Sequence, residues 1–397
     1  MYFTKRPFKA IVLAATVSTI SLSSANAFEA SDVAERLHQV FTRQHADLTY
    51  DEASMQGDDI LLSNVAVVRP NGETALKLGD LVLEDVTEDA DGNYRIERIV
   101  KDEIRVESEG TVLTITGDVE KGIVLIRDAE TDPLGGIYRS ESGNIAHLKM
   151  VSDLGLVLEI TDLRNTTEIS DDFTLDDRYH FGRFTLDTRQ MDSKAVSSGF
   201  RDFLKDMNLE QISGSAEFAY TLAPSTGVLT LSKTQVLIDD IGSIDMTGSF
   251  GGYSPALLKQ FAEFSTLEAH SEEDQAKKVA AALQFFQHLM FNDVSIRYED
   301  GGFAERLLKA LAVKHGSTRD GVLQHAKAMI AEIAPKLEIP FGKSVKPKLE
   351  AFLNDPQTIE VSAKPEKPMS FTMMLMTGAA SPKALFEQLN LKLTTNE

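Results

Sequence analysis

The chain has 397 residues, no cysteine and a net charge of −21 at pH 7. Without cysteine, the protein has no disulfides, no thiolate chemistry and no cysteine-bound metal. Residues 28–300 contain 51 Asp and Glu against 24 Lys and Arg, whereas residues 301–397 contain 10 against 13. This excess of negative charge repels phosphate backbones, so the sequence argues against a protein that binds nucleic acid.

Residues 1–27 have the pattern of a cleavable secretory signal peptide. Three basic residues precede an uncharged, mostly apolar stretch at 10–22, and Ala25 and Ala27 supply the small residues of a cleavage site. The apolar stretch is about 13 residues long, shorter than the roughly 20 that a membrane-spanning helix needs. We therefore expect cleavage after Ala27, a location in the periplasm, and no transmembrane segment in the mature chain.

The first element of the mature chain is a predicted amphipathic helix at 31–46. Ser31 and Asp32 suit the start of a helix, and Val33, Leu37 and Val40 recur at helical spacing. The apolar face of this helix is expected to pack on a sheet.

From about residue 58 to residue 250, short runs of β-branched and aromatic residues alternate with polar residues. This pattern predicts roughly ten strands. Turns are expected at 70–72, 91–93, 121–122, 225–227 and 241–243, where Gly, Asn, Asp, Lys, Pro, Ser and Thr occur. Because no helix-length pattern separates the strands, they are expected to pair antiparallel, with one buried face and one wet face.

The pattern changes near residue 254. Helices are predicted at 254–267, 272–291, 303–314, 318–333 and 382–388, and strands at 294–298, 358–363, 370–376 and 389–394. The predicted fold class is therefore α+β, a long curved antiparallel β-sheet followed by a helix-rich section that packs on it. The predicted domains are a β-rich antiparallel domain at 28–253 and a helix-rich α+β domain at 254–397.

The motifs of known catalytic and metal sites are incomplete. Residues 342–344 (Gly-Lys-Ser) resemble the end of a phosphate-binding loop, but Leu337 stands where that loop needs a glycine. Residues 89–93 resemble a calcium loop, but Arg98 stands where the bidentate Glu belongs, so a hairpin turn is the preferred interpretation. The Asp residues at 171–177 could hold a divalent cation weakly, and a solvated loop is the simpler interpretation. We predict no catalytic residue, no metal and no cofactor.

A group of Phe and Met residues on the predicted helices at 254–267 and 272–291 is the candidate binding site. These helices either cover the sheet or form with it a groove for an acyl chain or an apolar peptide. Met residues at 369–376 extend this adaptable apolar surface. The candidate ligand-binding residues are Phe261, Phe264, Phe286 and Met290.

The rhythm of strands at 212–220, 227–231 and 242–248, together with the segment 292–303, resembles that of AsmA-like envelope proteins and of uncharacterised exported proteins of Gram-negative bacteria. The resemblance covers about residues 140–310. It implies a curved β-structure with an apolar groove and a role in lipid handling. AsmA-like proteins usually keep a membrane anchor, whereas none is expected here after cleavage. The resemblance implies no catalytic residue.

The leading functional hypothesis is a non-enzymatic periplasmic protein that binds an apolar, lipid-like ligand or supports maintenance of the cell envelope. One alternative is an interaction module whose acidic surface docks a basic envelope protein, which predicts strong dependence on salt. Another alternative is a hydrolase whose site is assembled from distant residues, which predicts a His, a Ser and an Asp converging in one pocket.

Overall fold

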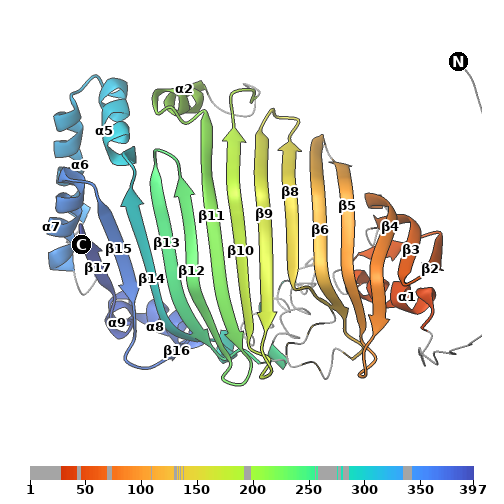
Figure 1. Ribbon diagram of the computed structural model, residues 1–397. Helices are drawn as coiled ribbons and strands as arrows, with labels where there is room; N and C mark the ends of the chain where they lie inside the picture. The colour runs from red at the N-terminus through yellow and green to blue at the C-terminus, as the bar shows by residue number, and fades with distance from the viewer. Residues whose placement is uncertain are drawn as a thin grey trace, which may run out of the picture.

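The computed structural model describes residues 28–42, 46–68, 74–108, 110–128, 132, 134, 136, 138–191, 198–254, 256–257, 275, 279, 286–333 and 342–397. These residues form one large antiparallel sheet of seventeen strands, with most of the helices in the C-terminal part (Figure 1). The predicted fold class is confirmed.

The N-terminal end of the sheet carries helix α1 on one face. The α1 helix forms because its apolar residues recur at helical spacing, and five of them are buried against the sheet. The elements in this part are α1 (Ala30–Thr42), β1 (Asp47–Thr49), β2 (Glu52–Gln56), β3 (Asp59–Val68), β4 (Thr74–Glu88), β5 (Tyr94–Ser108) and β6 (Thr111–Leu125).

The middle of the sheet consists of long strands joined by tight turns. The predicted turns at 91–93 and 225–227 are confirmed, the turn predicted at 241–243 lies at 239–241, and 70–72 lies outside the described residues. The elements here are β7 (Tyr138–Arg139), β8 (Ser142–Val151), β9 (Val157–Ile169), β10 (Leu175–Asp187), α2 (Ser198–Asp206), β11 (Gln211–Ala223), β12 (Val228–Ile238) and β13 (Gly242–Gly251).

The C-terminal part adds helices and four more strands to the same sheet. Strand β14 pairs with β13, so the sheet continues across residue 254. The elements are β14 (Met290–Asp300), α5 (Phe303–Lys314), α6 (Arg319–Ile333), α7 (Gly342–Asn354), β15 (Thr358–Ala363), β16 (Met369–Ser370), α8 (Phe371–Ala380), α9 (Pro382–Gln388) and β17 (Lys392–Thr395).

The strands follow one another in space in the order of the chain. The main run of pairings is β2-β3-β4-β5-β6, then β8 through β15 in sequence, then β17. The short strands β1, β7 and β16 lie beside β3, β6 and β14. All of these pairings are antiparallel, so the sheet is a single meander.

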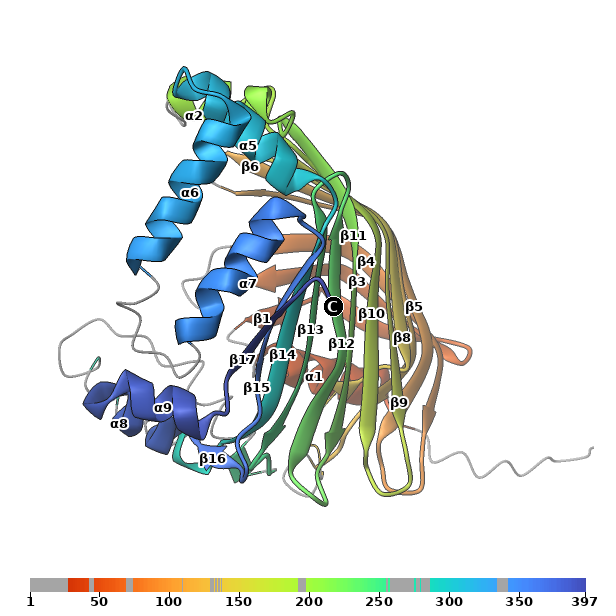
Figure 2. The ribbon, with the colours of Figure 1, turned by 90° about the vertical axis from the view of Figure 1, so that its left-hand side faces the viewer.

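Figure 2 shows the sheet curved into a gutter, with α6 to α9 on the concave side and no described helix on the convex side. Register shifts interrupt the pairing of β10 with β11, β11 with β12, β12 with β13 and β13 with β14. Such bulges bend a strand and increase its twist. Repeated in neighbouring strands, they account for the curvature of the sheet.

Two apolar cores lie at the ends of the sheet. The larger core packs α1 on β3 to β6, where Leu62, Leu83 and Ile123 are fully buried. The smaller core packs α8 and α9 on β14 through Phe291, Met369 and Leu389. Both helices on the C-terminal core begin with a serine whose hydroxyl accepts a backbone N–H, which satisfies a free end of the helix.

Several local predictions differ from the structure. Residues 121–122 lie inside β6, where Gly122 has φ of +60° and forms an irregularity instead of a turn. The strand predicted at 370–376 is helix α8, because Ser370 caps it and Met, Leu and Ala favour helix. Helices α2 and α7 were not predicted. Met290 begins β14 instead of ending a helix.

Candidate ligand-binding face

One face of the sheet, here called the inner face, is apolar along its length. It is the face on which α1 packs, and it lies on the concave side in Figure 2. Residues directly opposite each other on neighbouring strands point to the same face. The register therefore places one row on this face: Lys101, Asp118, Ile145, Leu163, Phe181, Ala216, Val236, Ile244, Tyr298 and Ile359.

The opposite face, here called the outer face, is polar and is crossed by ion pairs between neighbouring strands. Arg98 contacts Glu84 at 2.7 Å, and Lys149 contacts Glu159 at 2.7 Å. Gln235 likewise donates to Asp245 at 2.7 Å. Strict alternation between these two faces is what one expects of an antiparallel sheet with one solvated side.

The inner face carries large apolar side chains that remain exposed. Ile244, Ile296 and Val361 are 45%, 46% and 41% exposed, and they come from β13, β14 and β15. Ile296 lies directly opposite Val361, and Ile244 lies directly opposite Tyr298. We call these three residues the exposed patch. Clustered apolar exposure of this kind marks an interaction surface or a ligand-binding groove.

At the N-terminal end, the inner face leads to a cavity of about 300 Å³, here called the α1 cavity. Helix α1 contributes Leu37, Val40 and Phe41 to its wall, and β4 contributes Leu76, Leu78 and Leu81. Apolar surface that is removed from water contributes roughly 25 cal/mol per Å² to stability. An apolar occupant of the α1 cavity would therefore stabilise this end of the molecule.

The α1 cavity is polar on one side. Asp118 and Glu120 line it from β6, Lys101 from β5 and Tyr138 from β7. Burial, and secondarily the charge of Glu120, raise the pKa of Asp118 to about 6. The Tyr138 hydroxyl donates a hydrogen bond to the Glu120 carboxylate, and burial raises the pKa of Tyr138.

Lys101 does not neutralise this acid pair in the described structure. Its ammonium group donates to the backbone carbonyl of Leu78 at 2.8 Å and to that of Asp80. Burial lowers the pKa of Lys101, and the charges that oppose this effect come from Asp80 and Asp102. The lysine is therefore directed towards β4, and the two carboxylates face the cavity without a cation from the described chain.

A second carboxylate on the inner face, Asp177, has a structural role. Asp177 is 4% exposed and accepts hydrogen bonds from Thr167 at 2.9 Å, Tyr179 at 2.9 Å and Tyr220 at 2.7 Å. These three donors satisfy the carboxylate inside the sheet face. The neighbouring Asp172 instead accepts from Ser170 and Thr174 in a turn, so the acidic cluster predicted at 171–177 is divided between a turn and the inner face.

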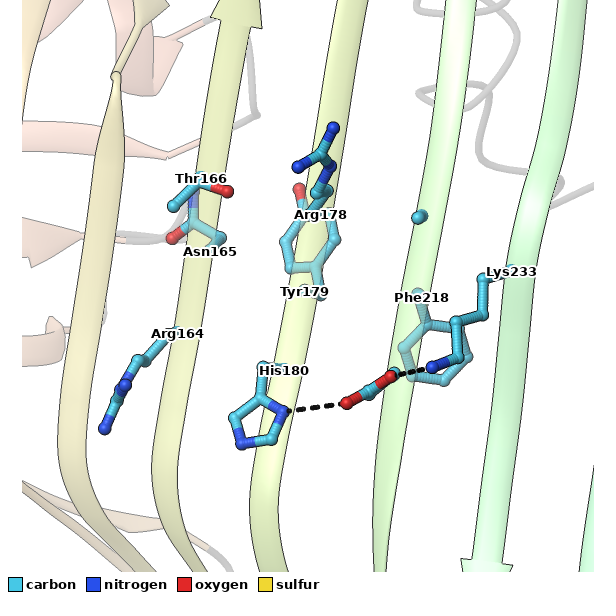
Figure 3. A pocket seen from close by; sticks show the side chains of 10 residues that line it. Arg164, Asn165, Thr166, Arg178, Tyr179, His180, Phe218 and Lys233 are labelled. Carbon is cyan, nitrogen blue, oxygen red and sulfur yellow. Dashed lines mark hydrogen bonds and ion pairs between the residues drawn. The ribbon is translucent and has the colours of Figure 1, made fainter.

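The outer face has a hollow of about 460 Å³ over β9 to β12 (Figure 3). His180 Nδ1 lies 3.5 Å from Glu217 Oε1, and Lys233 bonds the other oxygen of Glu217. The hydrogen bond from Lys233 holds the pKa of Glu217 below its ordinary value. No serine lines this hollow, so its described residues do not assemble the His, Ser and Asp that the hydrolase hypothesis requires.

The predicted binding residues have different outcomes. Phe261 and Phe264 lie outside the described residues. The Phe286 ring lies 6.1 Å from the ring of Phe371, beside the C-terminal core. Met290 lies opposite Gly251 and Ser370 at the start of β14, and alternation places its side chain on the other face from buried Phe291. The described structure therefore places Phe286 beside the C-terminal core and Met290 at the start of β14.

Sequence reasoning missed the exposed patch and the α1 cavity. The signal was present, because each strand alternates apolar and polar residues. Alternation alone places Asp118 and Glu120 on the opposite face from Ile115 and Ile123, and the irregularities at Gly117 and Gly122, both with positive φ, bring the two acids to the inner face. What alternation does not show is which part of the apolar face a helix covers.

Among the described residues, no group of three or more His, Asp and Glu side chains is arranged to hold a metal ion. The described helices include none that is long and apolar enough to cross a membrane.

A protein-family model described as "Uncharacterized protein" matches residues 235–396. This segment runs from β12 to the last residues of the chain and includes the exposed patch. A search of curated proteins found no match to the chain.

Proposed function

We propose that this protein is a non-enzymatic binder of lipid-like ligands, whose apolar chains lie on the inner face of the sheet. The observation that carries the proposal is the exposed patch, which continues the apolar rows of a curved sheet. The main run of strands spans roughly 60 Å at about 4.8 Å per strand, which exceeds the length of an extended acyl chain. The proposal also places the protein in the periplasm, with a role in maintenance of the cell envelope. The proposed similarity to AsmA-like proteins agrees with such a role.

Hydrocarbon suits this face better than a protein partner does. A protein interface carries about one hydrogen bond per 100–200 Å². The backbone groups within the sheet are already paired, and Ile244, Ile296 and Val361 offer no side-chain donor or acceptor. Contact with this region is therefore made through apolar side chains alone, which matches an acyl chain.

The arrangement of charge weighs against the alternative of an acidic docking module. On the outer face, Glu84, Glu159 and Glu217 each contact a cation from a neighbouring strand. A basic partner would have to displace these contacts. The ion pairs already present reduce the gain in binding free energy that such a partner would obtain.

The test compares two leucine-sized residues on adjacent strands that point to opposite faces. Ile244 on the inner face and Leu237 on the outer face are each 45% exposed. We expect the protein, purified without detergent, to show a lipid adduct in native mass spectrometry. The variant Ile244→Lys should lose most of this adduct because a charge interrupts the apolar row, whereas Leu237→Lys should retain it.

Two results would count against the proposal. One is a protein free of adducts that also fails to take up phospholipid from vesicles. The other is equal loss of lipid in Ile244→Lys and Leu237→Lys, which would indicate that the inner face is not the binding surface.

A further inference from the structure

The α1 cavity and the exposed patch belong to one continuous row of the inner face. From Ile244, the row passes through Val236, Ala216, Phe181, Leu163 and Ile145 to Asp118. The cavity is therefore the N-terminal end of the surface to which the proposed function assigns apolar chains, and the present inference rests on that function. The end differs from the rest of the row because α1 covers it.

The groups around the α1 cavity define the chemistry of an occupant. Helix α1 faces the cavity only with apolar residues, and β4 does the same. The charged and titratable lining groups are Asp118, Glu120, Lys101 and Tyr138. Lys101 is bonded to backbone carbonyls, and Tyr138 is bonded to Glu120. The described lining thus presents two carboxylates beside an apolar pocket, with no ammonium or guanidinium directed at Asp118.

We propose that the α1 cavity binds a single-chain amphiphile with an ammonium head group, with the chain against α1 and the head at Asp118 and Glu120. The volume of about 300 Å³ is at the lower end of the range for small-molecule sites, which suits one chain and not two. An ammonium group donates hydrogen bonds to carboxylates and compensates two acids in an apolar setting. An anionic head would instead add a third negative charge.

Binding of the ammonium head is sensitive to pH. Burial raises the pKa of Asp118 to about 6, so Asp118 is ionised at pH 7.5 and largely protonated at pH 5. Protonation removes one of the two charges that face the head group. The affinity for the ammonium amphiphile therefore falls as the pH decreases through 6, whereas that for an uncharged amphiphile changes little.

The experiment uses three probes with the same chain and different heads: dodecylammonium, dodecanol and dodecanoate, each below its critical micelle concentration. Isothermal titration calorimetry of the full chain at pH 7.5 should show one equivalent of dodecylammonium bound at least tenfold more tightly than dodecanoate. Asp118→Asn and Glu120→Gln should each reduce this preference severalfold. Glu159→Gln removes an acid from the outer face and should leave the preference unchanged.

Equal affinities for dodecylammonium and dodecanoate would overturn the inference, as would a preference that Asp118→Asn and Glu120→Gln leave intact. If the preference for dodecylammonium falls as much in Glu159→Gln as in Asp118→Asn, the preference comes from the net charge of the protein and not from the α1 cavity. These failures are distinct from failure of the proposed function. If Ile244→Lys removes the lipid adduct while head-group selection is absent, the inner face binds lipid and the α1 cavity does not select the head.

Discussion

The N-terminal end of the sheet and its part at β13 and β14 have the same alternating sequence pattern but different environments. At the N-terminal end, α1 covers the inner face, and Leu62 and Ile123 are 0% exposed. At β13 and β14, the same face leaves Ile244 and Ile296 nearly half exposed, although Phe352 of α7 packs against the neighbouring Tyr298. Apolar alternation therefore produces a closed core under α1 and a partly open apolar surface beside α7.

The largest expected effect is a difference in the free energy of unfolding between alanine substitutions in these two environments. Leu62→Ala should lower the free energy of unfolding by about 3 kcal/mol because it leaves a cavity in a closed core. Ile296→Ala should lower it by less than about 1 kcal/mol because its side chain is already partly in water. Urea denaturation followed by far-UV circular dichroism measures both values, and it suits a chain without tryptophan.

Similar losses in the two variants would contradict the comparison. A loss near 3 kcal/mol for Ile296→Ala would mean that the inner face at β13 and β14 is a closed core.

The next effect tests the acid pair at the covered end. The pKa of Asp118 is raised from 3.8 to about 6, so the ionised carboxylate is disfavoured in the folded state. The contribution of Asp118 to stability is therefore greatest below about pH 4 and is lost as the pH rises through 6. Asp118→Asn removes this penalty and should stabilise the protein by about 2 kcal/mol at pH 7.5, with a smaller gain at pH 5.

Urea midpoints of the parent protein and Asp118→Asn at the two pH values give this difference. A destabilised Asp118→Asn at pH 7.5, or a gain that does not shrink at pH 5, would mean that the carboxylate has a stabilising partner. A gain in stability for Asp118→Asn would also fit a binding role for Asp118, because residues kept for binding often reduce the stability of the fold.

The smallest effect concerns the outer face in the middle of the sheet. Lys233 and Glu217 form an ion pair whose side chains are 48% and 41% exposed. Water screens such pairs, so Lys233→Ala should change the free energy of unfolding by less than about 0.5 kcal/mol. The urea midpoint at low and at high salt checks this value, and a loss above 1.5 kcal/mol would show that the outer face also stabilises the sheet.

The sequence predicted the sheet well because strand pairing depends on local alternation and on tight turns. Helix 303–314 was also predicted with the bounds that α5 has, since its apolar spacing is regular. The residues at 370–376 show where the reasoning failed. A short apolar run suits both a strand and a buried helix, and the cap supplied by Ser370 decided between them.

The binding surface was harder to predict because it depends on which parts of the sheet are covered by helices in the folded protein. Phe286 and Met290 stand out by residue type, yet their neighbours Phe371 and Gly251 come from distant parts of the sequence. Ile244 and Ile296 do not stand out in sequence, and only the register across β12 to β15 brings their row together. Likewise, the isolation of Asp118 follows from the direction of the Lys101 side chain towards β4, which no sequence pattern contains.

The meander also determines how such a molecule can assemble and change in length. Since each long strand pairs with the strand before it and the strand after it in the chain, most pairings close only a short hairpin loop. Closing short loops costs little entropy, so a strand can readily add to the strand before it in the chain. One additional hairpin would lengthen the curved sheet by about 10 Å without disturbing the register elsewhere. Insertion or deletion of hairpins can therefore change the length of the sheet.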